Sequence, residues 1–290
     1  MALASVSLTD TQVFGAGQNL EFLPALSWEA PIQFFVGRNG SGKSKTAGAL
    51  TAMQPRDQAR LVSTDRLIGV MGLQNFGYGT GLGTWEGAPL RADQAQQMRN
   101  VAQQQGLAND VFYVLRDQPA VFLRIAALFR RAFGRRLFLA EVAGLVDPIV
   151  EDSAGRTYSL LRDEGHGLRE LTVLLAYTYE EGRELLVVDE PELHLHPALA
   201  RFWLEQLRLE CEDTGRRAVI ITHSPELVHP TELSELDSIW VFSPFLPPRN
   251  LGRAVHPDSA DVVAGSIRSN PRLVSGLVFS ARPVLVEGPQ

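Results

Sequence analysis

The chain contains the sequence Gly37-Arg38-Asn39-Gly40-Ser41-Gly42-Lys43-Ser44. It fits the pattern G-x-x-x-x-G-K-[ST] and lies between an apolar run, residues 32–36, and a helix-compatible stretch, residues 45–53. Glycines let successive backbone N–H groups curl around a phosphate, and the start of a helix adds the positive end of its dipole. Lys43 is predicted to reach the β- and γ-phosphates and Ser44 to bind Mg²⁺. The stretch therefore predicts a nucleoside triphosphate site.

Lysine is confined to this one place in the chain. Of the 27 basic residues only Lys43 and Lys45 are lysines. A GC-rich genome favours arginine codons, which explains why lysine is scarce but not where it occurs. A compact ammonium fits between phosphate oxygens better than the planar fork of arginine does. This requirement accounts for Lys43, whereas nothing comparable applies to Lys45.

The composition excludes several classes of protein. With 45% apolar and 21% charged residues, the 290-residue chain is typical of a soluble globular protein with one large domain or two modest ones. No apolar run approaches the roughly 20 residues that span a bilayer, and residues 1–10 lack the features of a secretory signal. One cysteine permits no intrachain disulfide. We therefore expect a cytoplasmic protein without a membrane partner.

Buried strands and helices alternate along much of the chain. Continuous apolar runs typical of parallel strands lie at residues 32–36, 185–188, 218–222 and 239–242. Helices are predicted at residues 168–179 and 197–212, and further strands at 60–64, 137–150 and 156–161. The alternation predicts the α/β class. We also expect short N-terminal strands in residues 3–36 and a helical region in residues 91–133.

Two acidic residues follow one of the apolar runs. Asp189 ends the strand at residues 185–188, a position from which a carboxylate can hold Mg²⁺ through water. Glu190 comes next and can polarise an attacking water. The alternative is a strand end with solvated charges, and the upstream phosphate loop makes the functional interpretation the better one.

A histidine follows a second apolar run. His223 comes directly after residues 218–222 and can hydrogen-bond a γ-phosphate oxygen or the attacking water. Taken alone, a loop histidine with an ordinary structural role is the better interpretation. Its combination with the phosphate loop and Asp189-Glu190 reverses that preference and makes Glu190 and His223 the predicted catalytic residues.

Together these motifs resemble the ABC-type ATPase superfamily. In more detail, the segment Asp189-Glu190-Pro191-Glu192-Leu193-His194-Leu195-His196-Pro197 resembles the RecF/OLD-like branch (OLD stands for overcoming lysogenisation defect), which contains DNA-repair and phage-defence ATPases. The resemblance implies one ATPase domain over residues 1–245, with a RecA-like mixed sheet, an N-terminal antiparallel β subdomain and a helical lobe at about residues 91–135. It also implies ATP and Mg²⁺ as cofactors, and a homodimer, or a higher oligomer built from it, that sandwiches two ATP molecules.

The same resemblance implies a signature segment that faces the partner's ATP. Gly165 and Gly167 stand at a predicted helix start, where N–H groups can bind a γ-phosphate. The family usually has serine where Glu164 stands, and a carboxylate there repels phosphate unless Mg²⁺ or an arginine intervenes. Gln74 and the segment Thr64-Asp65-Arg66 are rival candidates for the nucleotide-sensing loop.

Two further groups of polar residues have competing interpretations. His194 and His196 alternate like metal ligands, but a structural role in the loop that meets the partner subunit is the better interpretation. Five arginines form a basic cluster, for which a solvated helix face is a better interpretation than a nucleic-acid contact. The cluster consists of Arg124, Arg130, Arg131, Arg135 and Arg136.

The last ten residues suggest the start of another domain. Val284-Leu285-Val286-Glu287-Gly288 resembles the opening strand of a Toprim fold, in which Glu287 would bind metal. The chain lacks the later Asp-x-Asp of that fold, so we expect a truncated domain at residues 281–290 after a linker and connecting helix at residues 246–280. An unpaired terminal strand would also expose a sheet edge.

The sequence thus predicts an ATPase that regulates an attached Toprim nuclease acting on DNA, in phage defence or repair. A first alternative is an ATP-dependent scaffold or sensor that cages or releases an effector protein. A second is a transporter's nucleotide-binding subunit, which the altered signature and the His-Leu-His-Pro segment disfavour.

Overall fold

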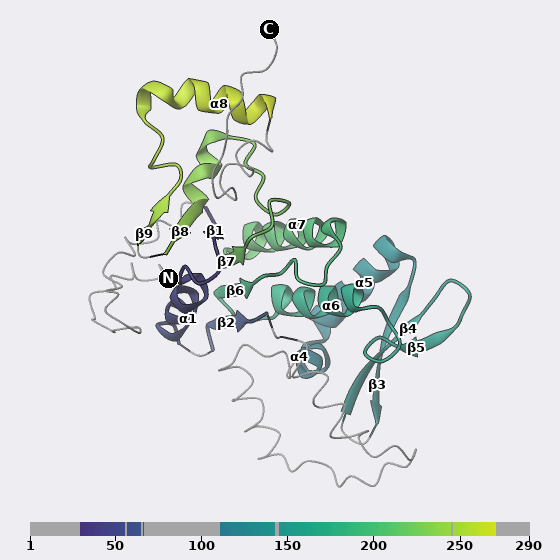
Figure 1. The fold of residues 1–290 in the computed structure, drawn as a ribbon. Coiled ribbons are helices and arrows are strands. Elements are labelled where there is room, and N and C mark those ends of the chain that lie inside the picture. Colours follow the sequence, from purple (N-terminus) through teal and green to yellow (C-terminus); the bar gives the residue numbers. More distant parts are fainter. Residues whose placement is uncertain are drawn as a thin grey trace. The chain divides into compact units, whose positions relative to one another are not determined.

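The computed structural model describes residues 30–55, 57–64, 66, 111–142, 145–244 and 246–270. The chain divides into two compact units, and Figure 1 labels their helices and strands. One, here called the terminal unit, consists of residues 1–49 and 217–290. The other, the central unit, consists of residues 50–216. Each unit is considered by itself.

A mixed sheet forms the core of the terminal unit. Its strands are β7 (Arg217–Thr222), β1 (Ile32–Gly37), β8 (Ile239–Ser243) and β9 (Leu246–Asn250), in that spatial order. The first three are parallel, and Phe34 of β1 lies opposite Ile220 of β7 and Ile239 of β8. These strands are buried because their apolar runs are covered on both faces. The predicted α/β class is confirmed.

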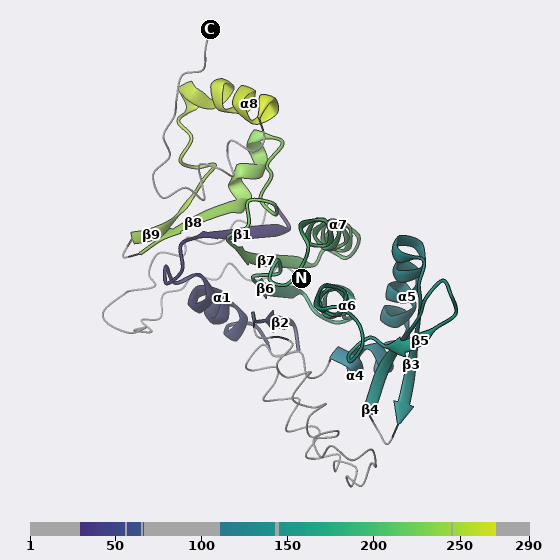
Figure 2. The same ribbon diagram turned by 45° about the vertical axis from the view of Figure 1, so that its right-hand side comes forward.

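Strand β9 corrects the predicted linker. Residues 246–250 contain Pro247 and Pro248, which we interpreted as linker residues, yet they pair antiparallel with β8 (Figure 2). Proline cannot donate a backbone hydrogen bond, but it is tolerated in an edge strand, where one side has no partner strand. In the described part of the chain β9 pairs with β8 alone, and Gly252 to Asn270 then lead through η2 (Pro257–Ser259) into α8 (Ala260–Ser269).

Helices and two short turns of 3-10 helix complete the terminal unit. Helix α1 (Lys43–Ala52) follows β1 through the phosphate loop, as predicted. The 3-10 helix η1 (Leu233–Ser238) precedes β8 and contacts α8. Buried Trp240 donates its indole N–H to Gln33 Oε1 at 2.9 Å, which satisfies this polar group between β8 and β1.

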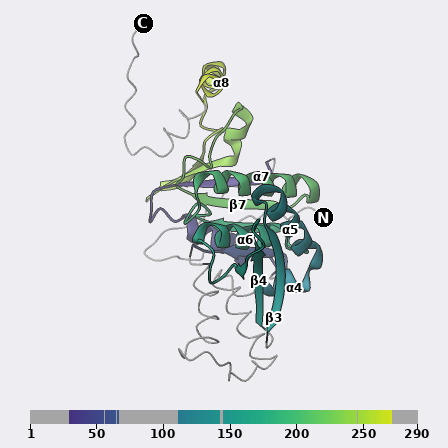
Figure 3. The same cartoon turned by 90° about the vertical axis from the view of Figure 1, so that its right-hand side faces the viewer.

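The central unit is built around helix α6. Strands β2 (Ala59–Val62) and β6 (Leu185–Asp189) are parallel, with Val62 opposite Val188. Helix α6 (His166–Tyr179) is buried along almost its whole length because apolar residues occupy most of its surface. It packs beside α7 (Pro197–Thr214), as Figure 3 shows, and also contacts α4 (Val111–Asp117) and α5 (Pro119–Phe133).

The predicted helical region is divided by a proline. Residues 91–133 were expected to be helical, and the described part, residues 111–133, contains two helices, α4 and α5. Pro119 occupies the first turn of α5, where its missing N–H is harmless, and it ends the preceding helix at Asp117. Gly134 closes α5 in the left-handed conformation.

An antiparallel sheet follows α5. Its strands are β3 (Arg136–Val142), β4 (Leu145–Glu151) and β5 (Thr157–Ser159), in sequential order. The strands predicted at 137–150 and 156–161 are thus confirmed, and β3 packs against α5. The N-terminal antiparallel subdomain predicted for residues 3–36 lies outside the described residues except for β1. No helix among those described is long and apolar enough to cross a membrane.

Candidate nucleotide-binding site

The phosphate loop leaves β1 at a glycine that no other residue could replace without rearrangement. Gly37 has φ 141° and lies opposite Phe242 of β8. A Cβ at Gly37 would overlap the carbonyl oxygen of Phe242. The close approach of β8 therefore accounts for the first glycine of the motif.

The next two glycines shape the loop itself. Gly40 and Gly42 have φ angles of 76° and 96°, in the region that L side chains rarely adopt. A Cβ would meet nothing within 4 Å at either position, so conformation rather than space requires glycine. Helix α1 follows directly, since Thr46 N donates to Gly42 O at 3.0 Å. The N–H groups of its first turn are the donors that the sequence predicts for phosphate.

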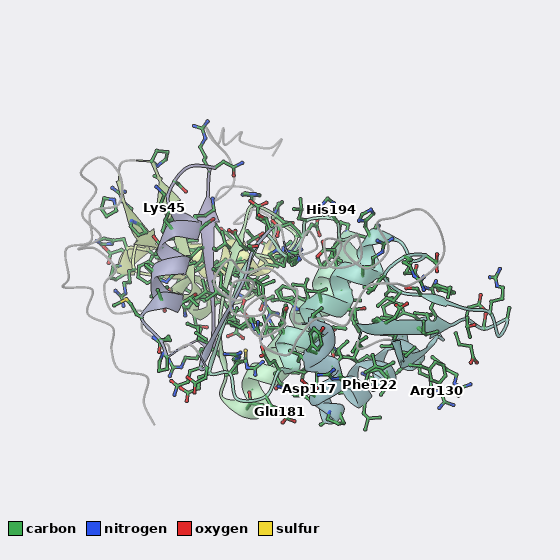
Figure 4. The ribbon with its side chains drawn as sticks, turned by 90° about the horizontal axis from the view of Figure 1, so that it is seen from below. Lys45, Asp117, Phe122, Arg130, Glu181 and His194 are labelled. Carbon is green, nitrogen blue, oxygen red and sulfur yellow. The ribbon has the colours of Figure 1, made fainter. Side chains whose placement is uncertain are left out.

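Lys43 anchors the loop from inside. Its ammonium donates to Gly37 O at 2.8 Å and to Arg38 O at 3.0 Å, and the residue is only 5% exposed. By contrast, Lys45 is exposed on α1 (Figure 4). The two lysines of the chain therefore lie in opposite environments two residues apart.

The loop contains two serines, one with a buried hydroxyl group and one that is exposed. Ser41 Oγ is buried and has no hydrogen-bond partner among the described residues. A buried hydroxyl without a partner is unfavourable, and a phosphate oxygen would satisfy it. Ser44, the predicted Mg²⁺ ligand, is exposed at the start of α1. The loop thus fits a triphosphate with its metal.

His223 leaves the sheet beside this loop. Strands β1 and β7 are parallel with Val36 opposite Thr222, so the residues that follow them lie at the same sheet edge. Buried Thr222 accepts a hydrogen bond from Ser224 N at 2.9 Å through Oγ1, which holds the turn that carries half-buried His223. His223 and the phosphate loop therefore follow adjacent strands at one edge of the sheet.

The predicted acidic residues occupy a distinctive loop in the central unit. Asp189 ends β6, and Glu190 has φ 49°, a left-handed conformation that is uncommon outside glycine. Arg66 follows the neighbouring strand β2 and is 0% exposed. Its guanidinium donates to the carbonyl oxygens of Asp189 at 3.2 Å and Glu190 at 3.4 Å. The side chain of Arg66 is thus engaged within the protein, and the nucleotide-sensing role of residues 64–66 stays a prediction.

The segment that carries Gly165 and Gly167 starts α6. Gly165 is the residue before the helix, with φ −64° and ψ 152°, and is exposed. The unusual Glu164 is neutralised locally: its carboxylate pairs with Arg135 and accepts from Tyr158 Oη at 2.6 Å and Gly165 N at 3.1 Å. Burial, and then this carboxylate, raise the pKa of Tyr158. Of the two groups expected to offset the charge of Glu164, Mg²⁺ or an arginine, the structure contains an arginine, Arg135.

The two histidines after Glu190 have structural contacts. His196 Nδ1 accepts from Ala198 N at 3.2 Å and caps α7. His194 has φ 64° and stacks near His166, with ring centroids 5.9 Å apart. No group of three or more potential metal-ligating residues occurs in the described part of the chain. These contacts favour the structural interpretation.

Most of the basic cluster is paired with acidic residues. Arg124 pairs with Glu210, Arg135 with Glu164, and Arg136 with Glu151 at 3.0 Å. The guanidinium of Arg124 also stacks over the ring of Tyr179, with Cζ 3.8 Å from the ring centroid. The pairing supports an ordinary solvated face over a nucleic-acid contact.

One buried ion pair beside the Glu190 loop could not be predicted from the sequence. Arg66 donates to Glu170 of α6, which is 1% exposed, and this pair could not be recognised from spacing. The one signal was a glutamate inside the apolar helix at residues 168–179, because a buried carboxylate needs a partner. Gln74 and Glu287, also predicted to have functional roles, lie outside the described residues.

Part of the chain matches a known protein family. Residues 108–229 match the family described as "AAA domain, putative AbiEii toxin, Type IV TA system". This segment includes Gly165, Gly167, Asp189, Glu190 and His223, and it does not include the phosphate loop. The likeness to an AAA-type ATPase domain and the phosphate-loop motif thus come from different parts of the chain. No curated protein matches the sequence.

Several solved structures are similar to the chain at low identity. A Smc head domain with a coiled coil and joint from Pyrococcus yayanosii has 14% identity and a TM-score of 0.32, covering 60% of this chain and 36% of that one. A SmcHead bound to the C-winged helix domain of ScpA has 13% identity and a TM-score of 0.33, covering 67% and 83%. A Smc head from Pyrococcus furiosus, bound to the C-terminal domain of ScpA, has 12% identity and a TM-score of 0.28, covering 67% and 56%.

Proposed function

We propose that this chain binds ATP with Mg²⁺ and hydrolyses it to ADP and phosphate. The observation that carries the proposal is the loop between β1 and α1, where Gly40 and Gly42 adopt positive φ angles and the buried Ser41 hydroxyl has no partner among the described residues. His223 follows the adjacent strand at the same edge. The AAA-domain match over residues 108–229 supports the same activity.

The site residues have distinct proposed roles. The backbone of residues 37–44 cradles the phosphates, and Lys43 exchanges its carbonyl contacts for β- and γ-phosphate oxygens. Ser44 and Asp189 hold Mg²⁺, whose charge offsets that of the phosphates. Glu190 orients the attacking water, and His223 contacts the γ-phosphate. Catalysis of this kind consists of positioning and electrostatic stabilisation.

The two lysines provide the test and its matched control. Lys43→Ala should abolish ATP binding because the buried ammonium is lost, whereas Lys45→Ala should bind like the parent because Lys45 is exposed. Equilibrium dialysis with radiolabelled ATP measures both, and phosphate release measures hydrolysis. Equal ATP affinity in the two variants would contradict the proposal.

We further propose a homodimer that encloses two ATP molecules. Gly165 and Gly167 of one subunit would present the N-terminus of α6 to the phosphate loop of the other. Both residues lie at an accessible helix start, and Glu164 beside them is paired with Arg135. Glu190→Gln should bind ATP, hydrolyse it slowly and accumulate as a dimer, which light scattering detects. A monomeric Glu190→Gln protein with bound ATP would argue against the dimer.

We also propose that the ATPase regulates an attached Toprim nuclease acting on DNA in phage defence or repair. Residues 284–288 and the segment 189–197 support this by resemblance, and Glu287 would be a metal ligand of the nuclease. The natural reading frame after Gln290 provides the test. An apolar strand followed by Asp-x-Asp would support the nuclease.

The alternative is an ATP-dependent scaffold that holds or releases an effector protein. The paired state of Arg124, Arg135 and Arg136 favours it, since these arginines are partly neutralised and less suited to DNA. A stop codon directly after Gln290, with an unrelated protein retained stoichiometrically in pull-downs, would support the scaffold over the nuclease.

A further inference from the structure

The loop that carries Glu190 is tied to one buried guanidinium. Besides Asp189 and Glu190, Arg66 donates to the carbonyl oxygens of Pro191 and Leu193, each at 3.3 Å. One side chain therefore contacts four carbonyl groups within five consecutive residues. A guanidinium can do this because it carries five N–H donors in a rigid plane.

These contacts coincide with unusual backbone geometry. Glu190 and His194 are the non-glycine residues with positive φ in the described part of the chain, at 49° and 64°, and both belong to this loop. Such conformations persist when the surroundings hold them. The loop is also folded on itself, since Leu193 N donates to Glu190 O and Leu195 N to Glu192 O, both at 3.0 Å.

The same guanidinium connects the loop to helix α6. Arg66 Nε donates to Glu170 Oε2, and the side chains are 0% and 1% exposed. Burial raises the pKa of Glu170, and Arg66 opposes that shift.

We propose that Arg66 is a positioning residue for ATP hydrolysis, which holds Glu190 in its left-handed conformation and links that conformation to helix α6 through Glu170. The inference rests on the proposed function. Since Gly165 and Gly167 begin α6, a partner that displaces the helix start would shift Glu170, then Arg66, then the Glu190 backbone. Arg66 thereby makes the water-orienting residue sensitive to what binds at the start of α6.

A second buried pair in the same unit provides the control. Arg60 of β2 donates through Nε to Glu180 Oε2 at 2.8 Å, and the two side chains are 3% and 4% exposed. Glu180 follows the C-terminus of α6, at the opposite end of the helix from Glu170. Arg60→Lys therefore perturbs a buried Arg–Glu pair on the same helix, as Arg66→Lys does, but away from its start.

The experiment compares Arg66→Lys with Arg60→Lys in the full chain. Lysine keeps the charge of Arg66 but cannot span four carbonyl groups. We expect kcat of Arg66→Lys to fall by roughly tenfold to 100-fold, with ATP affinity within about twofold of the parent, as misplacement of a reacting group predicts. Arg60→Lys should keep kcat within about twofold, the change expected when no reacting group moves.

A readout independent of catalysis accompanies the kinetics. Hydrogen exchange of the Leu193 and Leu195 amides should accelerate in Arg66→Lys and stay as in the parent in Arg60→Lys, because Arg66 donates to carbonyl groups of their loop whereas Arg60 pairs with Glu180. Should Arg66→Lys fail to fold, Arg66→Met/Glu170→Met replaces it, since removing both members of a buried pair is often tolerated. The double variant should fold, bind ATP, and show the same loss of kcat.

The outcomes separate this inference from the proposed function. Parental kcat and amide exchange in the Arg66 variants would overturn the inference while ATP hydrolysis by the parent stands. Equal losses of kcat in Arg66→Lys and Arg60→Lys would also overturn it, since both pairs would then act only on stability. Absence of ATP hydrolysis by both the parent and Lys45→Ala would instead refute the proposed function.

Discussion

At the scale of single residues, backbone conformation and burial distinguish positions that look alike in the sequence. Gly42 directly precedes α1 and Gly48 lies within it, and of the two only Gly42 has a positive φ, 96°. Lys43 and Lys45 differ in the same way by burial. Such differences decide which substitutions affect the site.

The two glycines give opposite predictions. Gly42→Ala should abolish ATP binding and lower stability by about 1 kcal/mol, because alanine is strained in the left-handed region. Gly48→Ala should raise stability by about 0.5–1 kcal/mol and preserve binding, since glycine is unfavourable inside a helix and a Cβ there meets nothing within 4 Å. Urea unfolding and ATP dialysis measure both. A destabilised Gly48→Ala protein would contradict the prediction.

Cys211 should be inert in the folded protein. It is the only cysteine, it is 2% exposed on α7, and burial raises its pKa to about 12. The thiolate is the reactive form, so at pH 8 iodoacetamide should leave the native chain unlabelled. Labelling should become complete in guanidinium chloride, as mass spectrometry will show. Rapid labelling of the native protein would mean that α7 is less well packed than described.

At the scale of elements, helix α6 is held at its C-terminus by a second buried cation. Arg216 donates to the carbonyl oxygens of Tyr177 at 3.2 Å, Thr178 and Glu180, and to Arg183 O at 2.9 Å. A cation at this end satisfies carbonyl groups left without helical partners and favours the helix dipole. Burial lowers the pKa of Arg216 from its ordinary value, and these carbonyl contacts offset the cost.

Removal of this cap should destabilise the protein. Arg216→Met should lower the free energy of unfolding by about 2–3 kcal/mol, the range for loss of buried hydrogen bonds to a charged group. Arg208→Met, on the exposed face of α7, is the control and should change stability by less than about 0.5 kcal/mol. Chemical denaturation followed by circular dichroism compares the two. Equal stability of both variants would show that the cap contributes little.

At the scale of the whole molecule, nucleotide binding should be visible as added stability. A ligand that binds only the folded chain raises stability by RT ln(1 + [L]/Kd), about 2.7 kcal/mol at 100 times Kd. Tm of the parent and of Lys45→Ala should therefore rise with Mg²⁺ and ATP, and Tm of Lys43→Ala should not. Differential scanning fluorimetry over a series of ATP concentrations tests this. A Tm of the parent that is independent of ATP would exclude specific binding.

Much of the fold and the nucleotide motif could be predicted from the sequence. Continuous apolar runs of four or five residues predict β1, β6, β7 and β8, because strands of a parallel sheet are buried on both faces. The spacing of glycine, lysine and serine in residues 37–44 predicts the phosphate loop. Glycine permits the backbone conformation of the loop, lysine supplies a positive charge for phosphate, and serine supplies a hydroxyl group for Mg²⁺.

The tertiary structure alone decided the rest. Residues 246–250 form a strand despite Pro247 and Pro248 because β8 offers them an edge to pair with. Arg66 became the support of the Glu190 loop because folding brought β2, α6 and β6 together and excluded water around its guanidinium. Local sequence patterns reflect interactions between residues that are close in the chain. They do not indicate which distant residue pairs with a buried charged side chain, because that partner is determined by three-dimensional packing.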